Sequence, residues 1–399
     1  MRIMLGSNPP WLNSGYGSQT RGLLTALQGL GHDVACFATY GLKGGKLEVG
    51  GVTMYPRCQD MWGADVLAGH LRDFEADLYV TLMDNWVFPP DYHDKFAVPW
   101  LSWFPVDTEP ARRSAARMAT RAEYNATFSR HGVRIMAEAG VAAEYLPLGV
   151  DIETFNPGDR EASRDYLQFP HDAFVVAMVA ANQSYPARKA FPENLEAFGR
   201  FQKRHPEALL YLHTEMQPTN PNNTLDLDEL LEALDISLEC VVRPNQYMYV
   251  TGAFGDEDMA QVYRAADVLL AASSNEGFGL PIVEAEACAC PVIVTDFASM
   301  PETAAGNGIL VPAKCRQYTR MGAWDVLPDI DGIEAALEMA YGWSDSEREM
   351  RGDQGVAHIW REYSWDVVTE RYWQPLLERI ERDVTLAKLE TRQAAARTR

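Results

Sequence analysis

The fold is decided by the stretch Asp267-Val-Leu-Leu-Ala-Ala-Ser-Ser-Asn-Glu276-Gly-Phe-Gly-Leu-Pro-Ile-Val-Glu284-Ala-Glu286. Its apolar start predicts a strand, a glycine-rich turn follows, and Pro281 stands where the first turn of a helix needs no N–H donor. The free amides of 277–280 would point out of this helix start, which suits a phosphate or another anion. Glu276 lies in the turn before the helix and Glu284 lies one turn into it, so two carboxylates flank the site. Because like charges repel, these carboxylates suit sugar and ribose hydroxyls better than phosphate.

Strands and helices alternate on both sides of this stretch. The alternation pauses once, near 146–157, which therefore reads as an interdomain linker. The pattern predicts an α/β protein with two Rossmann-like domains facing each other across a cleft. We expect an N-terminal acceptor domain at 1–150, a donor domain at 151–364, a helix at about 365–389 returning to the first domain, and a tail at 390–399. The expected strands are 2–6, 33–38, 78–82, 100–104, 174–180, 209–213, 268–272 and 292–295. The expected helices include one from about Ser18, 193–204, 227–234, 256–265, 281–288 and 333–342.

Composition narrows the classes of function. The chain has 399 residues, 47% of them hydrophobic and 23% charged, as in ordinary globular proteins of two or three domains. A net charge of −21 makes its surface as a whole a poor match to nucleic acid or anionic lipid. The six cysteines show neither zinc-site nor CxxC spacing, so we expect buried free thiols in a reducing compartment. Because we find neither a signal peptide nor an apolar run of about 20 residues, we predict a soluble, cytoplasmic protein.

The stretch around Glu276 and Glu284 resembles the E-x7-E motif of retaining glycosyltransferases with the GT-B fold, specifically family 4, the glycogen-synthase-like group. Residues 146–157, 256–267, 291–302 and 364–365 also resemble this family at matching distances. The resemblance implies transfer of a sugar from a UDP- or GDP-sugar to an acceptor hydroxyl, with retention of the anomeric configuration. It assigns catalysis to Glu276 and donor binding to Glu284. It also assigns the donor-binding helix start to Gly277, Phe278, Gly279 and Leu280.

A basic loop follows the first strand of the predicted donor domain, in Val179-Ala-Ala-Asn182-Gln-Ser-Tyr-Pro-Ala-Arg188-Lys189. It resembles the family loop whose basic pair contacts the donor diphosphate. Lys189 takes the lysine position and Arg188 stands beside it, while Asn182 stands where the family usually shows Gly-Arg. Fixed cations stabilise the charge that develops on a departing diphosphate, so we predict catalytic roles for both cations and donor binding for Asn182. The alternative is a solvated pair at a helix start, where cations oppose the helix dipole unless an anion binds.

Two N-terminal segments complete the predicted site. Ser14-Gly15-Tyr16-Gly17 resembles the family's first glycine loop, which lines the cleft near phosphate and acceptor; a simple turn is the alternative. Many family members place a histidine near the transferred sugar at the position where this chain has Asp107. The resemblance therefore gives Gly15 and Gly17 a donor-binding role and Asp107 a catalytic role on the acceptor side.

Neither a metal nor a resident cofactor is expected. Asp226-Leu-Asp228 imitates a metal-binding DxD, but it stands at a predicted helix start, where acidic residues cap the helix and favour its dipole. The nucleotide sugar is then a co-substrate whose diphosphate meets Lys189 and the helix start instead of a metal ion.

The acceptor is left open by the sequence. Glycans, lipid carriers, small metabolites and hydroxymethylated DNA bases all remain, the last disfavoured by the negative charge. An anionic acceptor could bind a helix face of arginines spaced four residues apart, although a solvated face is the alternative. These arginines are Arg113, Arg117 and Arg121, with Arg112 adjacent.

Two other functions stay open. A GT-B-fold epimerase or phosphorylase would act on a sugar nucleotide, but the chain places no histidine within a motif. A non-catalytic subunit would only bind the sugar nucleotide. The intact glutamate pair and Lys189 argue against this hypothesis.

Overall fold

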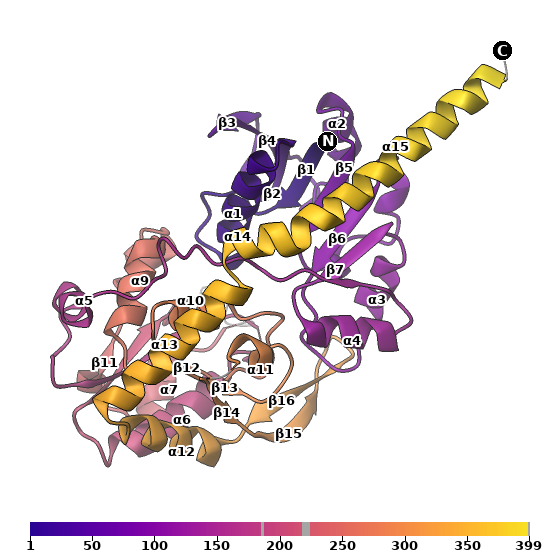
Figure 1. The fold of residues 1–399 in the computed structure, drawn as a ribbon. Helices are drawn as coiled ribbons and strands as arrows, with labels where there is room; N and C mark the ends of the chain where they lie inside the picture. Colours follow the sequence, from indigo (N-terminus) through magenta and orange to yellow (C-terminus); the bar gives the residue numbers. More distant parts are fainter. Residues whose placement is uncertain (185–186, 218–223, 306, 398–399) are drawn as a thin grey trace. The chain divides into compact units, whose positions relative to one another are not determined.

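The computed structural model describes residues 1–184, 187–217, 224–305 and 307–397. The chain divides into two compact units. Unit 1 comprises Met1–Pro105, Ala111–Gly149 and Trp365–Arg399, and unit 2 comprises Val106–Pro110 and Val150–Ser364. Each unit is a sheet with helices packed on it (Figure 1). The five residues Val106–Pro110 thus belong to the unit that contains the second half of the chain.

Unit 1 is built on a sheet of eight strands within its described residues, in the order β3-β4-β2-β1-β5-β6-β7-β8. The strands run parallel except for β3, which pairs antiparallel with β4. Its central strands are continuous apolar runs because helices cover a parallel sheet on both faces, and the four strands expected here are confirmed. The strands are β1 (Arg2–Ser7), β2 (Asp33–Lys43), β3 (Leu47–Val49), β4 (Val52–Arg57), β5 (Leu78–Leu82), β6 (Trp100–Phe104), β7 (Tyr124–Thr127) and β8 (Glu144–Tyr145). The helices are α1 (Gly15–Gly29), α2 (Leu67–Asp73), α3 (Arg113–Ala119), α4 (Arg130–Glu138), α14 (Trp365–Val368) and α15 (Gln374–Arg397).

Helix α1 begins earlier than expected. Ser14 caps it by accepting a hydrogen bond from the Gly17 amide at 3.1 Å, so the helix starts at Gly15 rather than near Ser18. Gly15 and Gly17 therefore lie in the first helical turn and not in a free loop. A Cβ atom on Gly17 would stand 2.0 Å from the Leu12 carbonyl oxygen, so this close approach requires glycine.

The C-terminal segment packs into unit 1 through the Trp365 side chain. Cβ atoms on Gly22 and Gly149 would stand 2.2 and 2.3 Å from its indole, so two glycines make the space for this ring. The single helix expected at 365–389 is instead α14, a π-helical turn over Thr369–Trp373, and α15, which reaches Arg397. The wider π turn changes the helix register midway.

Unit 2 contains a parallel sheet of six strands in its described part, in the order β11-β10-β9-β12-β13-β14. The chain runs outward from β9 and then returns to its other side at β12. Ligands of such sheets bind at the carboxyl ends of the strands beside this reversal. The strands are β9 (Phe174–Val179), β10 (Ala208–His213), β11 (Val241–Val242), β12 (Val268–Ala271), β13 (Val292–Thr295) and β14 (Ile309–Val311). The helices are α5 (Arg160–Leu167), α6 (Phe191–Gln202), α7 (Leu227–Ala233), α8 (Gln246–Val250), α9 (Asp256–Ala265), α10 (Leu280–Ala287), α11 (Met300–Thr303), α12 (Ile330–Tyr341) and α13 (Asp345–Glu362).

The structure adds several elements of unit 2 that the alternation did not predict, and two additions stand out. Helix α13 follows α12 with a Ser344 capping box. An antiparallel hairpin of β15 (Ala313–Tyr318) and β16 (Trp324–Pro328) separates β14 from α12. Both break the strand–helix rhythm on which the prediction rested.

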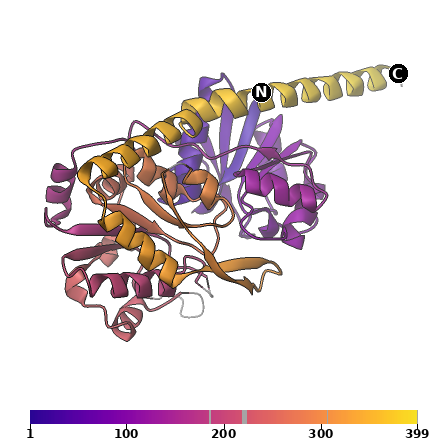
Figure 2. The ribbon, with the colours of Figure 1, turned by 60° about the horizontal axis from the view of Figure 1, so that its bottom comes forward.

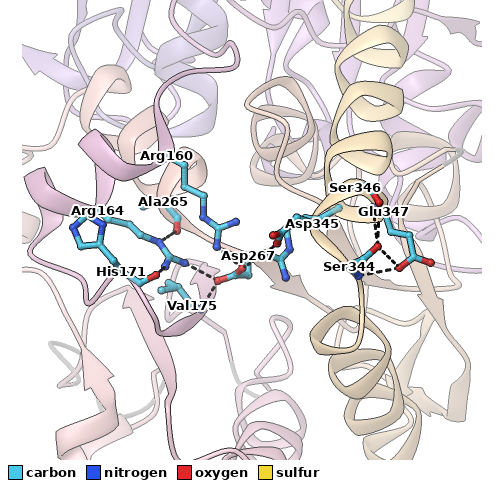
Figure 3. A network of polar contacts seen from close by, with 11 residues as sticks. Arg160, Arg164, His171, Val175, Ala265, Asp267, Ser344, Asp345, Ser346 and Glu347 are labelled. Carbon is cyan, nitrogen blue, oxygen red and sulfur yellow. Dashed lines mark hydrogen bonds and ion pairs between the residues drawn. The ribbon is translucent and has the colours of Figure 1, made fainter.

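A buried ionic cluster lies at the amino end of β12 (Figure 3). Asp267 accepts Arg164 Nη2 at 2.8 Å and Arg348 Nη1 at 3.0 Å, and Arg160 also pairs with it. The Val175 amide donates to the same carboxylate at 2.7 Å. The cluster joins α5, α13 and two strands.

All six cysteines lie among the described residues and are free thiols. Four are buried, whereas Cys58 and Cys315 are exposed, which corrects the expectation that all are buried. No helix in the described part of the chain combines the length and apolarity that crossing a bilayer requires.

Candidate active site

Glu276 is the centre of the site in unit 2. It follows β12 and is buried, with 7% of its surface exposed. Arg188 Nη1 lies 3.1 Å from its Oε2, and Lys189 pairs with its Oε1. The Arg188 guanidinium also donates to the Asn275 carbonyl at 2.9 Å. The loops after β9 and β12 thus bring together three of the four residues predicted to be catalytic, all but Asp107.

Electrostatics keep this cluster charged. Burial raises the pKa of Glu276, but Lys189 and Arg188 outweigh it and hold that pKa at about 2. Burial lowers the pKa of Lys189, and Glu276 opposes the change. Two cations facing one carboxylate leave an excess of positive charge, which can meet an anion.

Serine side chains fix the Glu276 loop. Ser273 donates from Oγ to Glu276 Oε1 at 2.9 Å. Ser299 donates to the backbone oxygens of Glu276 and Phe278, at 2.8 and 3.1 Å. Ser299 was missed because it comes from the next strand–helix connection, and no local motif marks it.

The predicted anion-binding helix start is formed by α10. Gly279 caps this helix at φ 94°, a left-handed conformation that favours glycine, and Pro281 stands in its first turn. Within the described residues, the amides of Gly277–Leu280 donate to no backbone or side-chain acceptor. Four donors at a helix N-terminus form a site for an anion beside Glu276.

Glu284 lies one turn into α10, as expected. Its Oε2 accepts a hydrogen bond from the Tyr263 hydroxyl of α9 at 3.0 Å. Burial raises the pKa of Glu284 to about 7, and the Tyr263 hydroxyl opposes this rise. The two glutamates of the motif therefore differ in charge: Glu276 is ionised, and Glu284 titrates near neutrality.

Asn182 is buried at the end of β9, and its side chain is engaged by the protein. Its Nδ2 donates to the carbonyls of Glu215 and Leu225 at 3.0 and 2.7 Å, and its Oδ1 accepts from the Leu225 amide at 3.1 Å. Its donor-binding role stays a prediction. The contacts show that the Asn182 side chain joins the loop after β9 to the connection between β10 and α7. Tyr185 and Pro186 of the same motif lie outside the described residues.

A cavity of about 440 Å³ lies beside the loop that Asn182 holds. It opens at the carboxyl ends of β10 and β11, next to the ion pair between Arg243 and Asp228. Sequence reasoning missed it because its lining comes from three separate connections. The lining residues are Glu215, Met216, Gln217, Asp228, Arg243, Gln246, Tyr247 and Val250.

Asp107 belongs to the short segment Val106–Pro110, which is part of unit 2. Two residues later, the Glu109 amide and carbonyl pair with the Trp324 backbone, both at 3.0 Å. Burial and then nearby Asp107 raise the pKa of Asp325 to about 6, and Asp325 accepts from Asn275 Nδ2 at 3.0 Å. Asp107 therefore lies close enough to Asp325 to raise its pKa, and Asp325 is hydrogen-bonded to the residue preceding Glu276.

The remaining predicted residues lie in unit 1 or away from the Glu276 cluster. Gly15 and Gly17 belong to α1, and the Tyr16 hydroxyl between them donates to Asp84 Oδ2 at 3.1 Å. Their donor role stays a prediction.

The arginines of the α3 region include exposed members and structural contacts. Arg113 and Arg117 are exposed, Arg121 lies beyond the helix end and 3.7 Å from Asp94, and Arg112 stacks on Trp86. An anionic partner there stays a prediction.

Asp226 caps α7, as expected, by accepting from the Glu229 amide at 3.1 Å. Asp228 pairs with Arg243 instead of sharing a site with Asp226. In the described part of the chain, no group of three or more His, Cys, Asp or Glu side chains could hold a metal ion.

The sequence comparisons relate the second half of the chain to known proteins. Residues 174–320 match the family model of glycosyl transferases group 1. Over 191 residues the chain is 32% identical to the D-inositol 3-phosphate glycosyltransferase of Saccharomonospora viridis, covering 45% of this chain and 41% of that protein. The enzyme of the same name from Mycobacteroides abscessus is 32% identical over 215 residues, covering 52% of this chain and 45% of the relative. The chain spans less than half the length of these curated relatives.

The solved structures extend the likeness to nearly the whole chain at the level of fold. The sucrose-phosphate synthase of Thermosynechococcus elongatus matches with a TM-score of 0.75 at 17% identity, covering 97% of this chain and 100% of that one. Anabaena HepE in complex with UDP-glucose matches with a TM-score of 0.71 at 14% identity, covering 95% and 100%. The chain therefore has the GT-B fold, as predicted.

The fold is thus that of the GT-B class, and the likeness to the glycosyl transferases group 1 model is confined to residues 174–320 of unit 2. The segment that matches the glycosyl transferases group 1 model contains Arg188, Lys189, Glu276 and Glu284.

Proposed function

We propose that this chain is a retaining glycosyltransferase that moves a sugar from a nucleoside-diphosphate sugar, preferably a UDP-sugar, to an acceptor hydroxyl. One observation carries the proposal: the Glu276 carboxylate, paired with Lys189 and Arg188, directly precedes the unpaired amides of Gly277–Leu280 at the start of α10. This cluster offers excess positive charge for a diphosphate and a fixed carboxylate for sugar hydroxyls. The UDP-glucose bound to HepE supports a uridine donor.

The residues divide the work by charge. Lys189, Arg188 and the N-terminus of α10 face the diphosphate and stabilise the negative charge that grows on its bridging oxygen as the sugar departs. Ionised Glu276 accepts hydrogen bonds from the transferred sugar, while Glu284 accepts one from a ribose hydroxyl. The cavity beside Asn182 has the size for the rest of the nucleoside.

These cations take the place of a metal ion in the proposal. Asp226 caps a helix and Asp228 pairs with Arg243, so both carboxylates already have partners within the protein. The acceptor hydroxyl approaches from the side of Asp107. The free thiols agree with a reducing compartment such as the cytoplasm.

The test measures UDP release from UDP-sugars with and without candidate acceptors, in buffer containing EDTA. We expect a donor panel to reveal one nucleotide sugar that raises the melting temperature. At 100 times its Kd, this donor should add about 2.7 kcal/mol to the free energy of unfolding. UDP release should then require an acceptor, survive EDTA and yield a product of unchanged anomeric configuration. Inversion of that configuration, or rescue of an EDTA-treated enzyme by Mn²⁺, would contradict the mechanism. Conversion of the donor without any acceptor would favour an epimerase.

A further inference from the structure

The hairpin β15–β16 presents a basic and aromatic surface that the donor site does not use. Figure 2 shows the hairpin, in orange, extending from the body of unit 2. Tyr318 is 64% exposed and Trp324 38% exposed, and their rings meet edge to face at 5.2 Å. Arg316 lies over the Trp324 ring at 5.3 Å, and Arg320 is exposed at the tip. We call these four side chains the hairpin platform.

The charge of the platform is opposite to that of the chain. Residues 313–324 contain Lys314, Arg316 and Arg320 but neither Asp nor Glu, whereas the chain carries −21. Lys314 is paired with Asp329 at 3.0 Å. Arg316 and Arg320 have no acidic partner within the described residues. A ligand that meets the platform should therefore be anionic, because the acidic remainder of the surface repels such a ligand and the platform attracts it.

The base of the hairpin is attached to the catalytic loop. Asp325 accepts from Asn275 at 3.0 Å, one residue before Glu276, and the Val326 amide donates to the Ser274 carbonyl at 3.4 Å. Trp324 pairs through its backbone with Glu109, two residues after Asp107. The platform therefore begins where the Asp107 segment and the Glu276 loop meet, which is the acceptor side of the proposed reaction.

Two polar atoms at this junction favour a ligand there. Asn275 Oδ1 and Asp325 Oδ1 are buried, and in the described part of the chain no donor meets either oxygen in hydrogen-bond geometry, although the Gln317 side chain of β15 lies near enough to Asp325 to lower its pKa. Buried polar atoms are normally paired, so these oxygens suit hydroxyl donors of a bound molecule or ordered water. Sugar hydroxyls supply such donors, while the flat face of Tyr318 suits the apolar face of a sugar ring.

We propose that the hairpin platform binds an acidic carbohydrate chain as the acceptor, with its sugar rings on Tyr318 and Trp324 and its carboxylate or phosphate groups on Arg316 and Arg320. This inference rests on the proposed function and adds the acceptor class to it. The platform holds the chain while its terminal hydroxyl reaches the Asp107–Asp325 junction. An anionic glycan is favoured over nucleic acid because the junction offers two acceptor oxygens, which suit a polyhydroxyl ligand.

The test uses alginate oligosaccharides as the acidic probe, dextran oligosaccharides as the neutral probe and oligo-dT as a polyanion without sugar hydroxyls in its chain. Binding is measured by affinity electrophoresis for the full chain, Tyr318→Ala, Arg316→Ala and the matched control Tyr166→Ala. Tyr166 is 61% exposed on α5 of the same unit. UDP affinity is measured for every variant, so that a failure of the donor site is seen separately.

We expect alginate to bind more tightly than dextran or oligo-dT, with a salt-sensitive affinity. Tyr318→Ala and Arg316→Ala should each weaken alginate binding by about tenfold, while Tyr166→Ala and all UDP affinities stay unchanged. Absence of alginate binding, equal loss in Tyr166→Ala, or tighter binding of oligo-dT would overturn the acceptor assignment even where UDP still binds. If the unmodified chain does not bind UDP, the proposed function itself is overturned.

Discussion

Two carboxylates at opposite ends of β12 are both buried among cations, yet they do different work. Asp267 precedes the strand and meets Arg160, Arg164 and Arg348 (Figure 3). Glu276 follows the strand and meets Arg188 and Lys189. Asp267 also accepts the Val175 amide of the neighbouring strand, so its cluster joins the elements of the fold to one another. Glu276 stands beside unpaired amides that can receive a ligand.

The difference lies in where a parallel sheet leaves its backbone groups. At the carboxyl ends of β9 and β12 the chain reversal opens a crevice, and helices such as α10 point their N-termini toward it. At the amino ends, α5 and α13 cover the strands and Asp267 is enclosed. A buried ionic cluster therefore indicates function in this fold when it follows a strand, and stability when it precedes one.

The largest expected effect is a loss of stability when the Asp267 cluster is broken. Asp267→Asn leaves three arginines without their shared counter-charge, and breaking a buried ion pair in this way costs about 3–5 kcal/mol. Urea unfolding measures the loss. Asp235→Asn, which removes an exposed partner of Lys203, should cost less than about 1 kcal/mol.

The folded fraction of Asp267→Asn should bind UDP as the unmodified chain does. A variant with normal stability and weakened UDP binding would reverse the roles of the two clusters.

The next largest expected effect is a loss of catalytic rate when the charge of Glu276 is removed. Glu276→Gln keeps the shape of the side chain but removes the charge facing the sugar, so we expect kcat to fall by about 10²–10³-fold, equivalent to about 2.7–4 kcal/mol. Steady-state UDP release measures it. Glu286→Gln is the matched control, because Glu286 is buried on the same helix and burial raises its pKa well above the ordinary value. Equal rates for Glu276→Gln and the unmodified chain would remove Glu276 from the chemistry.

The contrast also shows what the sequence could predict. Glu276, Lys189 and α10 were found because each belongs to a short motif of strand, turn and helix. The Asp267 cluster was not found, because its arginines lie about 80 to 107 residues away and only the fold brings them together. Ser299, Tyr263 and the hairpin were missed for the same reason.

Errors at element boundaries have local causes. Helix α1 starts at Gly15 because the Ser14 hydroxyl caps it, a contact that outweighs the weak helix propensity of two glycines. The cysteines were expected to be buried from residue type alone, but Cys315 is exposed on β15 of a hairpin that the alternation did not predict.

The smallest expected effect concerns Glu284, which shares the motif with Glu276 but not its cations. Burial raises its pKa to about 7 from an ordinary 4.5, so between these values the folded state holds a proton that the unfolded state has lost. The stability contributed by neutral Glu284 is therefore complete below pH 4.5 and is lost as the pH rises toward 7. Glu284→Gln is neutral at every pH and escapes this loss.

We therefore expect Glu284→Gln to melt like the unmodified chain at about pH 4.5 and to be more stable by about 1 kcal/mol at about pH 8, a value reduced to allow for the partial exposure of the side chain. Donor affinity should fall in the same variant by about tenfold, because the amide is a weaker acceptor for a ribose hydroxyl than the carboxylate. Tyr263→Phe removes the hydroxyl that opposes the rise in pKa, so its pH-dependent loss should extend to higher pH. Melting curves across this range and UDP titrations measure both effects. A stability difference that is the same at both pH values would mean that Glu284 is already ionised at the lower one, and its environment would then resemble that of Glu276.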